Sequence, residues 1–176
     1  MVSLRRGLTL IMFGSIAFLL ISCQSNSNSE SNVEIDSSSA FNYLKNLEGS
    51  WTVDGGDEGI FGWEFDVTSR GKVIVEKLKV GTPAEMTTVY SIDNGKLMAN
   101  HYCQLNNQPT LRQVKMDKDG DLHFECNGDV GNTQSHDALH MHGVHFKKEG
   151  DKMIVWMDML ENGKVAFETK YELRRR

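Results

Sequence analysis

The chain has 176 residues, and 24 acidic against 19 basic side chains give it a formal net charge of −5 at pH 7. This length suits one domain of ordinary size with a short extension. Because binding to phosphates needs clustered positive charge, the acidic balance argues against a nucleic acid as a partner.

The first 23 residues have the pattern of an export signal. Arg5 and Arg6 precede an apolar or small run at residues 7–21, which is typical of a secretory signal and not of a membrane-spanning helix. The sequence Leu-Ile-Ser-Cys at residues 20–23 resembles a bacterial lipobox, in which the thiol of Cys23 is diacylated and the preceding peptide is removed. We therefore predict a lipoprotein signal peptide at residues 1–22. The alternative is a plain secretory signal with an incidental cysteine.

A polar segment rich in Ser and Asn follows. Such a composition cannot bury enough apolar surface to offset the entropy of ordering it. We predict a tether at residues 23–39, lipidated at Cys23, and a folded domain at residues 40–176. Since buried acyl chains contribute about 0.8 kcal/mol per methylene, the expected partner is a lipid bilayer. The expected location is the cell envelope, on the periplasmic face of an outer membrane or on the cell surface in a Gram-negative cell.

The folded part begins with one short predicted helix and continues with strands. Residues 41–49 carry apolar side chains at helical spacing, after a serine as candidate N-cap and before Gly49 as the stop. Alternating apolar residues separated by Asp, Asn and Gly turns then predict roughly ten antiparallel strands. We expect these strands at residues 51–53, 61–67, 73–80, 86–92, 97–104, 110–116, 122–127, 139–147, 153–160 and 165–174. With no helices to cover a sheet, closure into an up-and-down barrel removes the free edges, so the fold class is all-β.

Small barrels of this kind can hold one ligand in the lumen. In the strand at residues 73–80, Glu76 shares an apolar face with Ile74, Leu78 and Val80, whereas Val75, Lys77 and Lys79 alternate to the other face. A carboxylate on the apolar face has two interpretations. Glu76 contacts a ligand, or it pairs with an arginine or a tyrosine hydroxyl inside the lumen.

Several short motifs together resemble a bacterial family of lipocalin-like barrels. They are Leu47-Glu48-Gly49-Ser50-Trp51, Gly81-Thr82-Pro83-Ala84-Glu85-Met86, Val89-Tyr90, His101-Tyr102-Cys103, Asn107-Gln108-Pro109 and His140-Met141-His142. The resemblance covers nearly all of residues 41–173. It implies a calycin-type barrel, similar in architecture to fatty-acid-binding proteins and nitrobindins. It implies no particular reaction, since fold does not fix function.

Two histidines dominate the candidate chemistry. His140 and His142 are two apart on a strand, so they are expected on one face, about 6.5 to 7 Å apart. This spacing suits two ligands of one metal ion, with His101 or Cys103 as a third. Because Val144 follows on the same face, both histidines can equally be hydrogen-bonded residues of the lumen.

The cofactor and the cysteine chemistry stay open at this stage. A histidine or Met141 could ligate haem, but no signature singles out one proximal histidine. We therefore favour neither haem nor a metal. Cys103 and Cys126 could form a disulfide in an exported protein, although the sequence does not give their separation. The spacing of Cys103 from His101 argues against a thiolate nucleophile, and we predict no catalytic residue.

Taken together, these patterns predict a membrane-anchored protein that binds a small amphipathic or apolar molecule in the lumen of a barrel. The alternatives are a metal- or histidine-dependent enzyme that uses the same cavity and a purely structural envelope lipoprotein. Asn107 and Gln108 lie in a polar turn at the expected mouth. The candidate ligand-binding residues are Glu76, Tyr90, His101, Cys103, Asn107, Gln108, His140 and His142.

Overall fold

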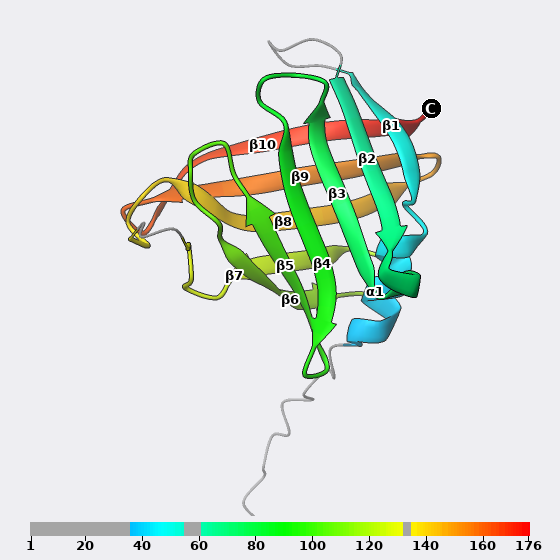
Figure 1. The fold of residues 1–176 in the computed structure, drawn as a ribbon, viewed down its shortest axis with the longest axis horizontal. Helices are drawn as coiled ribbons and strands as arrows, with labels where there is room; N and C mark the ends of the chain where they lie inside the picture. Colours follow the sequence, from blue (N-terminus) through cyan, green and yellow to red (C-terminus); the bar gives the residue numbers. More distant parts are fainter. Residues whose placement is uncertain (1–35, 55–60, 132–134) are drawn as a thin grey trace, which may run out of the picture. The chain divides into compact units, whose positions relative to one another are not determined.

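The computed structural model describes residues 36–54, 61–131 and 135–176 (Figure 1). The predicted signal peptide, Cys23 and most of the predicted tether lie outside these residues. The elements are α1 (Ser37–Lys45), β1 (Gly49–Asp54), β2 (Phe61–Thr68), the short 3-10 helix η1 (Ser69–Gly71), β3 (Val73–Val80), β4 (Met86–Asp93), β5 (Lys96–Tyr102), β6 (Thr110–Met116), β7 (Leu122–Cys126), β8 (His140–Glu149), β9 (Lys152–Glu161) and β10 (Lys164–Arg175).

The described strands form one closed antiparallel barrel. Each strand pairs with its neighbours in the sequence, and β1 pairs with β10 to close the ring through Trp51 opposite Arg175 and Val53 opposite Leu173 (Figure 1). Among the ten described strands, closure leaves no unpaired sheet edge. The all-β fold class and the ten-stranded up-and-down barrel predicted from the alternation are therefore confirmed.

Two of the hairpins form as their sequences predict. Asn94 and Gly95 connect β4 to β5, and Asn162 and Gly163 connect β9 to β10, all four with positive φ. A two-residue turn with both central residues at positive φ matches the twist of the strands on either side. The Asn-Gly pairs therefore set the register of these hairpins locally.

The helix lies earlier in the chain than predicted. It spans Ser37–Lys45, and its N-cap is Asp36, whose carboxylate accepts hydrogen bonds from the backbone of Ser38 and Ser39, each at 3.0 Å. Residues 37–39 are thus the first helical turn and not the end of a tether, and Leu47 lies in the turn after the helix. Among the described residues, no helix has the length and apolar character needed to cross a membrane.

The helix covers the barrel end at which β4 ends and β5 begins. The Ser37 hydroxyl accepts a hydrogen bond from the backbone N–H of Leu97 at 3.1 Å. The helix residues Ala40, Phe41 and Leu44 are buried. The apolar spacing predicted a helix correctly, and the docking contact with Leu97, remote in sequence, explains why its first turn includes the serines.

Aromatic side chains fill the centre of the lumen. Tyr90 lies 5.5 Å from Phe124 and 6.3 Å from Phe146 between ring centroids, and Phe65 lies 6.4 Å from Phe146. All four rings are completely buried. Small barrels are commonly filled by their own side chains in this way, so most of the lumen is a packed core.

The predicted alternation of β3 is correct except at its end. Ile74 and Leu78 are buried with Glu76, as expected. Lys79, predicted to point outward, is also buried, at a positive φ of 55°. The pairing with β2 shifts by one residue here, so that Val80 lies opposite Gly62. This β-bulge turns Lys79 toward the interior and is the physical reason for the departure.

Candidate functional site

An apolar pocket of about 140 Å³ lies at the barrel end opposite α1, where β3, β5 and β9 end and β4, β8 and β10 begin. Its wall includes four methionines, two aromatic residues and three polar residues: Met86, Met141, Met157, Met159, Phe167, Tyr171, Lys79, His101 and Cys103. Leu105 and Phe167 also line it and are 39% and 47% exposed. The pocket therefore opens to solvent past apolar side chains.

His101 is a polar residue among those that line this pocket. The side chain is fully buried, and its Nδ1 lies 2.9 Å from the hydroxyl of Thr88. Burial lowers the pKa of His101 to about 4, so the imidazole is neutral near pH 7. Its other ring nitrogen, Nε2, is buried and has no hydrogen-bond partner within the described part of the chain. One hydrogen-bonding position of His101 is therefore unused among the described residues.

Glu76 is tied to two aromatic side chains in the core and does not line the pocket. Its two carboxyl oxygens accept hydrogen bonds from Trp63 Nε1 at 2.7 Å and from the Tyr90 hydroxyl at 2.6 Å. The second of its predicted roles, a pair with a tyrosine hydroxyl, is thus confirmed. Burial raises the pKa of Glu76 to about 7 against the lowering effect of these hydrogen bonds, and burial also raises the pKa of Tyr90 well above its ordinary value.

Cys103, predicted in the lumen, differs in position from Asn107 and Gln108, predicted at the mouth. Cys103 lines the pocket, with its sulfur 3.9 Å from that of Met86, and burial raises the pKa of its thiol. The thiolate form is therefore disfavoured. Asn107 is buried and donates a hydrogen bond from its amide to the Leu139 carbonyl at 2.8 Å, which fixes the chain entering β8. Gln108 is exposed, and neither amide lines the pocket.

His140 and His142 do not line the pocket either, and the prediction that they share a lumen face with Val144 is wrong. A β-bulge in β8 is the reason. His140 pairs with Leu160 and Met141 with Met159, but the next pair joins Gly143 to Asp158, so His142 is an extra residue. The bulge changes the alternation, and Met141 contributes to the pocket instead.

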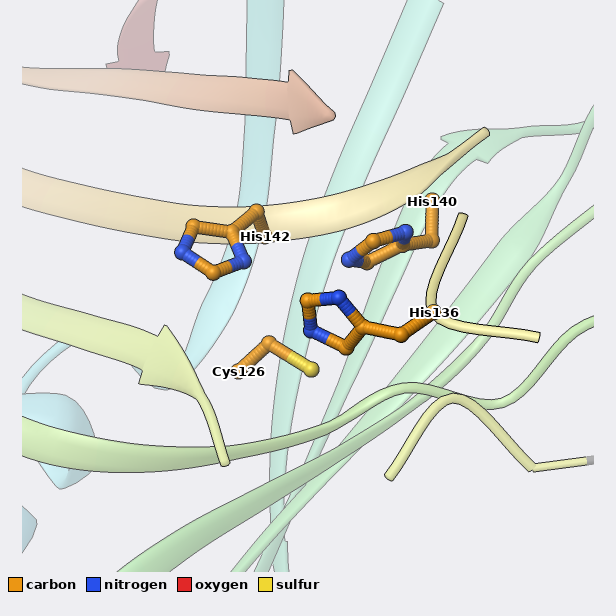
Figure 2. A group of neighbouring side chains, drawn as sticks. All are labelled: Cys126, His136, His140 and His142. Carbon is orange, nitrogen blue, oxygen red and sulfur yellow. The ribbon is translucent and has the colours of Figure 1, made fainter. Parts of the chain in front are cut away.

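The two histidines instead join Cys126 and His136 in a compact group, the histidine–cysteine cluster (Figure 2). The ring centroid of His136 lies 4.7 Å from that of His140 and 5.9 Å from that of His142. One ligand atom from each of the four residues lies within 4.8 Å of all the others. Neither His101 nor the other cysteine, the two predicted third ligands, belongs to this group.

Reasoning from the sequence missed Cys126 and His136. A signal was present, because three of the six histidines, His136, His140 and His142, occur within seven residues. Both Cys103 and Cys126 are free, so the disulfide that was left open is not formed.

A second group of metal-binding residue types lies on β7, β8 and β9. His123, His145 and Asp158 also have ligand atoms within 4.8 Å of one another. These groups already contact one another: the two imidazoles stack with 3.6 Å between centroids, and His145 Nε2 lies 3.1 Å from an Asp158 oxygen. His145 also stacks on Trp156 at 4.5 Å. The contacts account for the positions of His145 and Asp158, whereas His123 Nε2 is buried and has no hydrogen-bond partner among the described residues.

No family model, curated protein or solved structure matches this chain. By fold, the described part of the chain is all-β, with a closed ten-stranded antiparallel barrel and one short α-helix. Such a barrel is compatible with ligand binding. The resemblance to lipocalin-like families stays a prediction.

Proposed function

We propose that this protein is a lipid-anchored envelope protein of lipocalin-like type, whose barrel binds a small, mainly apolar molecule bearing one polar group. The observation that carries the proposal is the mainly apolar pocket of about 140 Å³, which is lined in part by His101, a residue whose buried Nε2 has no hydrogen-bond partner among the described residues. A binding role fits this combination better than a structural role, because an unsatisfied buried polar atom reduces stability unless another group hydrogen-bonds to it.

The volume of the pocket sets the size of the ligand. Cavities of about 150 Å³ hold one benzene molecule, and sites for drug-sized ligands span about 300–1,000 Å³. At about 140 Å³, this pocket suits one aromatic ring or a short branched chain. A macrocycle as large as haem does not fit in it. The packed rings of Tyr90, Phe124 and Phe146 close the lumen beneath, so a long acyl chain finds no path inward.

The wall of the pocket sets the chemistry of the ligand. Thioether and aromatic groups favour an apolar body through contact and burial. His101 Nε2 favours a hydroxyl or N–H on that body. A single hydrogen bond of this kind contributes about 0.5–1.5 kcal/mol, so phenol should bind up to about tenfold more tightly than benzene.

Direct titration tests this proposal. Phenol and benzene are titrated into the full-length protein, and binding is followed by ligand-observed NMR. Met157→Trp should abolish binding of both, because the indole occupies the pocket that Met157 lines. His101→Phe should retain benzene but lose the preference for phenol. Met98→Trp is the matched control, since Met98 is half-exposed and does not line the pocket.

Two outcomes oppose the proposal. Absence of binding by either probe at millimolar concentration leaves the barrel with a structural role. Binding that survives Met157→Trp places the ligand elsewhere.

The anchoring half of the proposal rests on the sequence around Cys23. We expect a Cys23→Ser variant to remain in the soluble fraction and to incorporate no labelled palmitate, whereas the unsubstituted chain is labelled and sediments with membranes. Acylation is the physical reason, because two or more acyl chains hold a protein stably on a bilayer. Equal labelling of the two proteins would contradict acylation at Cys23, and absence of label in both would favour a plain secretory signal.

A further inference from the structure

The histidine–cysteine cluster lies where two neighbouring strands separate. The ladder between β7 and β8 ends at the pair of Glu125 with Gly143. Cys126 and His142 are the next residues beyond this pair, and the connection between the two strands brings His136 back toward them. Figure 2 shows the side chains of the cluster pointing toward one another. Residues up to sixteen positions apart in the sequence are thereby brought around one point.

We propose that Cys126, His136, His140 and His142 form a four-ligand site for a divalent transition metal, with zinc as its best-matched occupant. The four ligand atoms already lie within 4.8 Å of one another. In a tetrahedral zinc site, Zn–N distances of about 2.0–2.1 Å and Zn–S distances of about 2.3 Å place neighbouring donor atoms about 3.3 to 3.6 Å apart. Side-chain rotations that contract the cluster by about 1 Å therefore complete the geometry.

His140 is oriented as a metal ligand. Its Nδ1 lies 2.7 Å from the carbonyl oxygen of Ala138. Because a carbonyl oxygen only accepts, Nδ1 carries the proton, and the lone pair of the neutral ring lies on Nε2. That nitrogen is buried without a hydrogen-bond partner among the described residues. A backbone carbonyl that fixes one ring nitrogen while the other faces the ion is the usual arrangement around protein-bound metals.

His142 and Cys126 also have ligand atoms that a metal can bind. His142 Nδ1 is also buried and unpartnered within the described ranges. Cys126 is half-buried. Its sulfur has one weak contact, with the Asp129 carbonyl oxygen at 3.7 Å, and a metal can replace this contact.

The ligand types select the metal. One thiolate with three imidazoles suits zinc or copper, whereas calcium and magnesium require oxygen ligands. Four protein ligands leave no open position, which is typical of zinc sites that bind or stabilise rather than catalyse. This site is distinct from the lumen pocket, so it does not depend on the proposed ligand.

The second group of metal-binding residue types, His123, His145 and Asp158, is a poorer match for zinc. His145 Nε2 already pairs with Asp158, although His123 Nε2, 3.6 Å from a Glu125 oxygen, has no hydrogen-bond partner among the described residues. This group also lacks a thiolate. His123 therefore serves as a matched control, half-buried like His136 and outside the histidine–cysteine cluster.

Cobalt substitution tests the proposal on the full-length protein, purified without metal and kept reduced. Tetrahedral Co²⁺ bound to a thiolate gives intense visible bands and a near-ultraviolet charge-transfer band. We expect both bands at one Co²⁺ per chain, and their loss when Zn²⁺ is added. Cys126→Ser should remove the charge-transfer band, whereas Cys103→Ser should keep it, because Cys103 lies in the lumen pocket. His136→Ala should weaken Co²⁺ binding by about 100-fold or more, and His123→Ala should not.

Circular dichroism of each variant checks that the barrel is intact, and His136→Ala provides a readout even if Cys126→Ser fails to fold. The proposal is overturned if the folded protein gives no charge-transfer band at saturating Co²⁺. It is equally overturned if the band follows Cys103 instead of Cys126, or if His123→Ala weakens binding as much as His136→Ala.

Discussion

Relative to the unsubstituted protein, the Glu76→Gln variant is expected to gain about 3 kcal/mol of stability as the pH rises from about 4.5 to about 8. Glutamine keeps the size of the side chain and can accept a hydrogen bond from Trp63 Nε1 while it donates one to the Tyr90 hydroxyl, but it never ionises. The gain comes from removing the cost of a buried carboxylate.

The direction follows from the pKa of Glu76, which is 4.5 in the reference state and about 7 in the fold. Between these values the folded protein binds more protons than the unfolded chain, so the contribution of Glu76 to stability is present at low pH, falls as the pH rises and becomes constant above about 7. His101 acts in the opposite direction. Its pKa of about 4 in the fold means that its contribution is present above the ordinary value of 6.5 and is lost as the pH falls. The two effects offset one another in the unsubstituted protein.

Urea denaturation at several pH values gives the free energy of unfolding of both proteins. His101 contributes equally to both, so its contribution cancels in the difference between them. Glu64→Gln is the control, because Glu64 is half-exposed on β2; a surface change of this kind is expected to stay within about 0.5 kcal/mol at all pH values. A difference between Glu76→Gln and the parent that stays constant from acid to alkaline pH would show that the Glu76 pKa is not raised in the fold.

Phe146→Ala is expected to cost about 3–5 kcal/mol of unfolding free energy, the range for removing a fully buried aromatic side chain. Phe146 is completely buried and contacts the rings of Phe65, Tyr90 and Phe124. Truncation therefore leaves a cavity in the middle of the lumen that neighbouring side chains fill only in part.

Chemical denaturation measures this loss, and Phe167→Ala is the matched control. Phe167 is 47% exposed at the rim of the pocket, so its truncation should cost less than about 1 kcal/mol. If Phe146→Ala costs no more than Phe167→Ala, the lumen is loosely filled, and a ligand much larger than one ring becomes acceptable.

The barrel was predictable because its signals are local. Alternating side chains predicted the strands, and the Asn94-Gly95 and Asn162-Gly163 pairs predicted tight hairpins, which formed. The start of the helix was predicted too late. The Asp36 cap is a local signal that was missed, whereas the docking of Ser37 against a backbone group sixty residues away cannot be read from the local sequence.

The candidate sites were only partly predictable, for a related reason. His101 and Cys103 line the pocket as expected, since they lie near the end of a regular strand. His142 departed from its predicted face because a bulge depends on the partner strand, not on the residue itself. Cys126 lies within 4.8 Å of the three histidines by its ligand atom although it is ten or more residues from each of them, a proximity that spacing along the chain does not describe.

The most direct test of the proposed binding role is a map of backbone amide chemical shifts of the isotope-labelled protein during a phenol titration. We predict saturable shifts concentrated around His101, Cys103, Met141 and Met157, with the amides near Ser37 and Leu97 at the opposite barrel end unchanged. Shifts that do not saturate, or that concentrate around the helix end of the barrel, would contradict a ligand site in the lumen pocket.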